Sequence, residues 1–132
     1  MDAATRRSVR QRALDRCEYC RLPQAGQPFV TFHVEHVIPK KHRGSDDPVN
    51  LCLSCERCNS HKGTNLTGLD PAAGHIEPLF NPRAQPWADH FELRGALIVG
   101  LSPVGRTTVE VLAMNEGRRV QLRADLIARG EF

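Results

Sequence analysis

The chain has 132 residues, of which 40% are hydrophobic and 25% charged. This length suits one compact domain with a modest core and does not favour two independently stable domains. Lysine and arginine number 18 against 15 acidic residues, and the resulting net charge of +3 permits an acidic partner without requiring one. The polar first residues lack the apolar run of a secretory signal or a membrane span. We therefore expect a cytoplasmic protein with no membrane contact.

The N-terminal segment is predicted to form a short amphipathic helix over residues 5–16. Val9, Ala13 and Leu14 recur there at helical spacing among arginines. These three residues should face the interior, and the arginines should form the exposed face.

The middle of the chain favours two strands and a second helix. β-Branched and aromatic residues over 29–36 favour an extended strand, which Pro39 ends. A second short strand over 50–53 precedes a helix that reaches Gly63, a residue typical of helix C-termini.

The C-terminal half begins with residues 67–85, whose three prolines predict an irregular segment packed across the surface. Residues 91–101, with Gly95 in the middle, predict a small hairpin. Ser102 followed by Pro103 then indicates an N-cap and the first position of a helix.

Two helices are predicted to complete the chain. The first should carry an apolar stripe made of Val104, Thr108, Val109 and Leu112. The last should start near Arg118, with Val120, Ala124 and Ile127 facing inward.

Four of the five cysteines form two CxxC pairs, Cys17 with Cys20 and Cys55 with Cys58. In a reducing compartment this arrangement favours a metal over disulfides. Four thiolates can surround Zn²⁺ tetrahedrally at about 2.3 Å and leave no open position for a substrate, so the predicted zinc site is structural. Cys52, the odd cysteine, is expected to be a small buried residue.

Further motifs follow one another in a characteristic order around the cysteine pairs. They are Val34-Glu35-His36-Val37-Ile38-Pro39, Gly44-Ser45-Asp46-Asp47, Asn50-Leu51 and Asn59-Ser60-His61-Lys62-Gly63. Together with the CxxC pairs this order resembles the HNH endonuclease family, from Cys17 to about Asn65. The resemblance implies an α+β fold in which a small ββα-metal core, residues 17–65, carries the four-cysteine zinc site. An N-terminal helix and a C-terminal extension, residues 66–132, would complete a single nuclease domain over 1–132.

The resemblance also implies a role for each motif residue in phosphodiester hydrolysis. In-line hydrolysis needs a base for the attacking water, a cation for the developing charge and stabilisation of the departing 3′-oxygen. His36 would be the base, because a histidine side chain can take up and release a proton near physiological pH. Glu35 and Asn59 would bind a catalytic Mg²⁺ or Mn²⁺ ion through oxygen. Asn50 would tie down the loop and hold His36 in orientation.

Glu35 and His36 are neighbours and would point to opposite faces of a regular strand, so one centre can use both only if the strand bends or ends there. The pattern also departs from the family name, since a glutamate stands in the first pair and Asn59 replaces the last histidine. Both substitutes retain an oxygen ligand. His61 and His33 are alternatives for a third ligand, or are polar histidines of the surface.

The basic residues near these motifs are expected to contact the phosphates of double-stranded DNA, which would make binding independent of base sequence and sensitive to salt. These residues are Lys62, Lys40, Lys41, Arg43, Arg6 and Arg10. The leading hypothesis is a metal-dependent DNA endonuclease. The alternative is a catalytically inactive, zinc-stapled nucleic-acid-binding module, which differs only in lacking cleavage.

Overall fold

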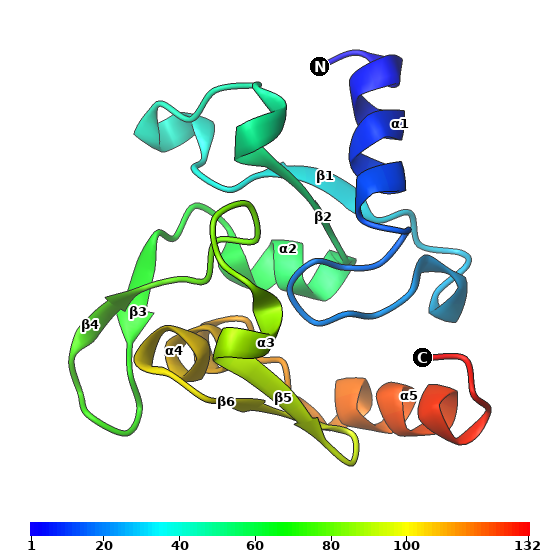
Figure 1. The fold of residues 1–132 in the computed structure, drawn as a ribbon, viewed down its shortest axis with the longest axis vertical. Coiled ribbons are helices and arrows are strands. Elements are labelled where there is room, and N and C mark those ends of the chain that lie inside the picture. The colour runs from blue at the N-terminus through cyan, green and yellow to red at the C-terminus, as the bar shows by residue number, and fades with distance from the viewer.

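The computed structural model describes residues 1–132 and has an α+β fold, as predicted (Figure 1). The helices are α1 (Ala3–Arg12), α2 (Glu56–Lys62), α3 (Trp87–His90), α4 (Pro103–Val111) and α5 (Gly117–Ala128). The strands are β1 (His33–His36), β2 (Leu51–Ser54), β3 (Thr67–Leu69), β4 (Ile76–Pro78), β5 (Phe91–Arg94) and β6 (Leu97–Gly100). Consecutive strands pair into three antiparallel two-stranded sheets. None of the helices has the length and apolar character needed to cross a membrane.

Helix α1 is shorter than predicted. Asp2 caps its first turn by accepting a hydrogen bond from the Thr5 amide at 2.7 Å. The helix ends at Arg12, because Leu14 and Asp15 adopt left-handed backbone angles, with φ of 56° and 53°, that reverse the chain. Leu14 is therefore 79% exposed, and the prediction that it faces inward is wrong.

Two arginines of α1 fasten the helix to the first sheet. Arg10 donates to the carbonyl of Phe32 at 2.7 Å. Arg12 donates to the carbonyls of Leu51 at 2.7 Å and Pro48 at 3.1 Å. Arg12 is exposed, as predicted, whereas Arg10 is only half-exposed. Both guanidinium groups bind carbonyl oxygens that neighbouring segments offer, which the prediction of an exposed face did not include.

Strand β1 begins at His33, four residues later than predicted. The side-chain amide of Gln24 accepts from the Phe32 amide at 2.9 Å and donates to the Val30 carbonyl at 2.8 Å. These bonds hold the preceding residues in a turn, in which Phe29 is 98% exposed.

Strands β1 and β2 and helix α2 form a ββα unit. In the antiparallel register Glu35 lies opposite Cys52 and His36 lies opposite Leu51. All four residues of β2 are buried, and α2 follows directly, with Cys55 as its N-cap. The unit places the end of β1 beside α2, near the centre of the molecule (Figure 1).

The segment predicted to be irregular contains a short hairpin, β3 with β4, and that part of the prediction is wrong. Its register pairs Thr67 with Pro78 and Leu69 with Ile76. Strands of three residues are too short to show a clear alternation of apolar and polar residues. A salt bridge from Asp70 to Arg106, with Nη2 and Oδ2 at 2.7 Å, links this hairpin to α4.

The second hairpin and the following helix agree with the sequence patterns. Strands β5 and β6 pair around a turn in which Gly95 has a φ of +59°. Ser102 caps α4 by accepting from the Gly105 amide at 3.0 Å, and Pro103 is the first helical residue. Thr108 of the predicted stripe is fully buried.

Helix α5 presents a different face to the core than predicted. Arg119, Arg123 and Leu126 are buried, whereas Ile127 is 41% exposed, so the prediction that Ile127 faces inward is wrong. Arg123 donates to the carbonyls of Ala96 at 2.7 Å and of Met114 at 3.0 Å.

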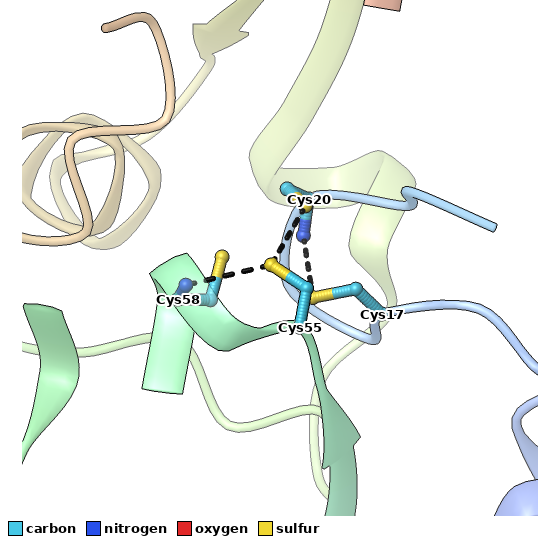
Figure 2. A group of neighbouring side chains, drawn as sticks. All are labelled: Cys17, Cys20, Cys55 and Cys58. Atoms are coloured by element: carbon cyan, nitrogen blue, oxygen red, sulfur yellow. Dashed lines mark hydrogen bonds between the residues drawn. The ribbon is translucent and has the colours of Figure 1, made fainter. Parts of the chain in front are cut away.

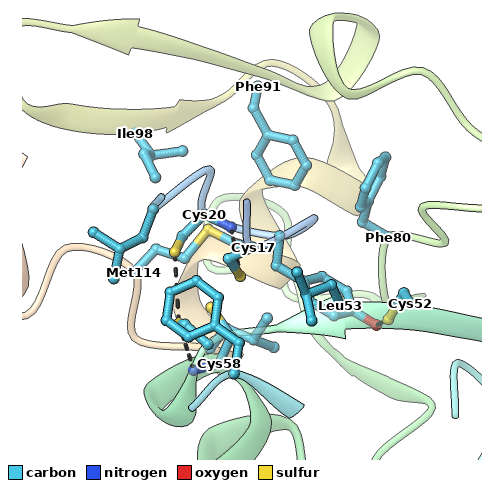
Figure 3. Packing of buried hydrophobic residues seen from close by; sticks show 14 of the residues in the cluster. Cys17, Cys20, Cys52, Leu53, Cys58, Phe80, Phe91, Ile98 and Met114 are labelled. Atoms are coloured by element: carbon cyan, nitrogen blue, oxygen red, sulfur yellow. Dashed lines mark hydrogen bonds between the residues drawn. The ribbon is translucent and has the colours of Figure 1, made fainter. Parts of the chain in front are cut away.

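The buried core includes the cysteines and joins both halves of the chain. Figure 3 shows Phe91, Ile98 and Met114 of the C-terminal half packed in one cluster with Cys20 and Leu53. The extension therefore shares its core with residues 17–65, and the single nuclease domain over residues 1–132 stays a prediction.

Candidate functional sites

The two CxxC pairs come together as the sequence predicts. Figure 2 shows Cys17 and Cys20, from the turn after α1, pointing toward Cys55 and Cys58 at the start of α2. The four sulfur atoms lie within 4.8 Å of one another and are buried, with Cys20 and Cys55 Sγ 3.7 Å apart. Tetrahedral zinc–sulfur bonds of about 2.3 Å require sulfur atoms about 3.8 Å apart. The cluster therefore fits a closed, structural zinc site.

Backbone amides support the same sulfur atoms. The Cys20 amide donates to Cys17 Sγ and the Cys58 amide donates to Cys55 Sγ, each at 3.4 Å. Each pair thus folds into the same tight turn, which explains why two residues separate the cysteines. Such hydrogen bonds favour the thiolate form that binds metal.

An arginine from the far end of the chain completes the cysteine site. Arg119 Nη2 lies 2.9 Å from Cys58 Sγ and 3.9 Å from Cys55 Sγ. Its Nη1 donates to the carbonyls of Leu112 at 2.5 Å and Ala113 at 3.0 Å. Burial acts to lower the pKa of Arg119, but the negative charge of the cysteines outweighs it and raises this pKa above its usual value. The sequence offered no signal for this role, because arginines in a helix are usually solvated.

A second, open site lies where β1 ends. A pocket of about 260 Å³ is lined by Glu35, His36, Pro39, Lys40, Lys41, Asn59, Gly63 and Thr64. Glu35 and His36 both reach it because His36 is the last residue of the strand. Asn59 joins them from the middle of α2. The structure thus gathers the three motif residues expected to do chemistry, together with two lysines.

Glu35 has one oxygen atom without a partner. Its side chain is 9% exposed, and its Oε1 lies 3.4 Å from Lys62 Nζ. Its Oε2 is buried and has no hydrogen-bond partner. Burial raises the pKa of Glu35, and the nearby Lys62 ammonium opposes that shift. Glu35 and Asn59 line the same pocket, and a carboxylate oxygen without a partner there suits a hard divalent cation such as Mg²⁺ or Mn²⁺.

His36 makes a short contact with Asp46. Its Nε2 lies 2.6 Å from Asp46 Oδ1, and Lys40 Nζ lies 3.1 Å from the same oxygen. Hydrogen bonds from His36 and Lys40 lower the pKa of Asp46 to about 2. Asp46 belongs to one of the sequence motifs, but that motif by itself predicts no role for it.

Asn50 holds the loop rather than the imidazole. Its Oδ1 accepts from the Ile38 amide at 2.8 Å, and its Nδ2 donates to the carbonyls of Ile38 at 3.0 Å and Ser45 at 2.9 Å. A Cβ atom at Gly44 would stand 1.6 Å from the Ile38 carbonyl oxygen, so glycine is required for this closure. The expected effect of Asn50 on His36 is therefore indirect.

Lys62 does not lie on the surface, so its expected place among the DNA-contacting lysines is a wrong prediction. It is 2% exposed, and its Nζ lies 3.3 Å from the His36 carbonyl oxygen. Its position opposite the buried Glu35 carboxylate accounts for the burial. Neither alternative third ligand lines the pocket: His61 is exposed on α2, and His33 pairs with Glu56 at 2.5 Å.

The other basic residues predicted to contact DNA differ in their position and in whether the protein already binds their side chains. Lys40 and Lys41 line the pocket, and Arg43 and Arg6 are exposed elsewhere on the surface. Arg10 already donates to the Phe32 carbonyl. Their contacts with phosphates stay predictions.

The stretch of chain that carries these motifs is similar to a known protein family. Residues 17–65 match the family model described as HNH endonuclease. The Septu protein PtuB of Bacillus thuringiensis is 31% identical over 104 residues, which cover 77% of this chain and 37% of that relative. The chain therefore corresponds to little more than a third of the length of PtuB. No solved structure gave a significant match.

Proposed function

We propose, from the match of residues 17–65 to the HNH endonuclease family model, that this chain is a metal-dependent endonuclease that hydrolyses phosphodiester bonds of DNA. The family itself implies a nuclease or nucleic-acid-binding function. The observation that carries the finer proposal is the meeting of Glu35, His36 and Asn59 at one polar pocket.

His36 is the proposed general base. It accepts a proton from water while the water oxygen bonds to phosphorus and the bond from phosphorus to the 3′-oxygen breaks, and the departing 3′-oxygen takes up a proton from solvent water. Glu35 and Asn59 would hold Mg²⁺ or Mn²⁺, which supplies neutralisation of the charge on the phosphate and on the departing oxygen. The products would carry 5′-phosphate and 3′-hydroxyl ends.

Lys40 and Lys41 are proposed to bind the phosphates that flank the cleaved bond. Both line the pocket, and an ammonium group attracts a phosphate without reading the base sequence. Binding of double-stranded DNA should therefore weaken steeply as salt increases. The four cysteines would bind Zn²⁺ and hold the ββα unit in place without taking part in the reaction.

Nicking of supercoiled plasmid DNA tests the proposal. We expect nicking in Mg²⁺ or Mn²⁺, and we expect His36→Ala to lower its rate by roughly 10²–10⁴-fold, the usual range for a general base. The matched control is His75→Ala, an exposed histidine between β3 and β4 that should leave the rate unchanged. His61→Ala should also leave it unchanged, since His61 lies outside the pocket.

The metal dependence is best tested by omitting the divalent ion, because a chelator would also remove zinc from the cysteine site. Zinc content should be measured in each sample. Equal nicking by His36→Ala and the unmodified protein would contradict the proposal.

The inactive binding module remains the second candidate because the Lys62 ammonium lies 3.4 Å from Glu35 Oε1. This positive charge offsets part of the negative charge with which Glu35 would bind a metal ion. Salt-sensitive DNA binding without nicking in either metal would support that candidate and reject the endonuclease.

A further inference from the structure

We propose that Asp46 is a positioning residue for His36, which it holds through Nε2 so that Nδ1 is the nitrogen that accepts the proton from water. This inference deepens the proposed endonuclease function and rests on it. The two residues belong to different elements, since His36 ends β1 and Asp46 lies in the loop before β2.

The hydrogen bond between Asp46 and His36 determines which nitrogen of the imidazole carries a proton and which one can accept a proton. An ionised carboxylate only accepts hydrogen bonds, so the contact of 2.6 Å between Asp46 Oδ1 and His36 Nε2 requires a proton on Nε2. In a neutral imidazole the lone pair is then on Nδ1. His36 Nδ1 has no hydrogen-bond partner in the protein.

A lysine also contacts the Asp46 carboxylate. Lys40 Nζ lies 3.1 Å from the same Oδ1 atom that contacts His36. Two donors on one oxygen atom keep the carboxylate ionised and restrict its rotation. Lys40 also lines the pocket, so the lysine that contacts the Asp46 carboxylate lies where phosphate is proposed to bind.

The loop that carries Asp46 is fastened on both sides of it. The carbonyl oxygen of the preceding residue, Ser45, accepts a hydrogen bond from Asn50 Nδ2 at 2.9 Å. The following residue, Asp47, donates its amide to Ser45 Oγ at 3.3 Å. Gly44 packs directly against the backbone of Ile38. The buried Asn50 amide therefore fixes the loop, and Asp46 transmits that order to the imidazole.

Substitution at position 46 separates positioning from mere loop structure. Asp46→Asn keeps the shape but offers an amide that can donate to Nε2, which favours the tautomer with its proton on Nδ1. We expect kcat for nicking to fall about 10²-fold, with a KM change below about threefold, because the base is lost while phosphate binding persists. Asp47→Asn is the matched control, since the Asp47 side chain makes no contact with His36.

Nitrogen NMR of the histidine rings provides a readout that does not depend on cleavage. In protein free of added divalent metal, at a pH where His36 is neutral, we expect the Nε2–H tautomer. Asp46→Asn should shift the ring toward Nδ1–H, whereas Asp47→Asn should leave it unchanged. Zinc content and melting temperature should match in all three proteins.

The proposal is overturned if unmodified His36 carries its proton on Nδ1, or if Asp46→Asn nicks DNA as fast as Asp47→Asn. If the unmodified protein fails to nick DNA, the proposed endonuclease function fails instead. The tautomer of His36 still decides in that case whether Asp46 controls the ring.

Discussion

The cysteine site and the pocket at the end of β1 are built in opposite ways from the same short ββα unit. The four sulfur atoms are buried, and two backbone amides and Arg119 bond to them. The pocket is open and polar, and one oxygen atom of Glu35 in its wall has no partner. A buried cluster whose sulfur atoms bond to one another's amides and to an arginine suits a structural role, whereas a buried oxygen atom without a partner in a residue that lines a pocket leaves a position for a ligand.

The two sites share helix α2, which gives them an order of dependence. Cys55 caps the helix, and Asn59 follows it by one turn. Loss of the cysteine site should therefore disorder the pocket as well. Damage to the pocket should leave the cysteine site intact.

The largest effect is expected from breaking the cysteine site. Cys58→Ala removes one thiolate and should abolish zinc binding and cooperative unfolding, because structural zinc contributes roughly 10–16 kcal/mol in small zinc-finger peptides. Thermal melting with zinc analysis measures this. Cys52→Ala is the control, since Cys52 is an equally buried cysteine outside the cluster. Retention of one zinc and an unchanged melt in the Cys58 variant would show that the cluster is not a metal site.

A smaller effect is expected from removing the ammonium group beside Glu35. Lys62→Met leaves a buried carboxylate unpaired and should lower the free energy of unfolding by about 3–5 kcal/mol. Binding of Mn²⁺ to the native protein should recover part of this loss, because a ligand of the folded state stabilises it. Urea unfolding with and without Mn²⁺ measures both effects, with zinc content unchanged.

The exposed Lys41→Met serves as its control and should change stability little. A destabilisation of Lys62→Met that Mn²⁺ leaves untouched would mean that Glu35 does not bind the ion.

The smallest effect is expected from removing the charge behind the cysteine site. Arg119→Ala should weaken zinc binding about 10–100-fold, the usual result of losing a group that supports metal ligands. Competition with a zinc chelator measures this affinity. Arg118→Ala is the matched control, since Arg118 is exposed on the same helix. Equal zinc affinities of the two variants would reduce Arg119 to a packing residue.

Much of the fold could be predicted because its signals are local. The CxxC spacing, the Ser102-Pro103 start of α4 and the turn at Gly95 each depend on neighbouring residues. The hairpin β3–β4 was missed because its strands have only three residues each. Leu14 was misplaced because left-handed angles end the helix before it.

For the two sites, too, local features could be predicted from the sequence and contacts between distant residues could not. By itself the sequence determined which residue types stand together along the chain, namely the cysteine pairs and the Glu35, His36 and Asn59 motif. Only the tertiary structure decided that Lys62 turns inward to Glu35, that Asp46 reaches His36, and that Arg119 reaches Cys58. A helix such as α5 offers more than one face to a core, and the face that turned inward brought a cation to a buried group of sulfur atoms. Such pairing depends on charges that are distant in sequence and close in space, which no local pattern records.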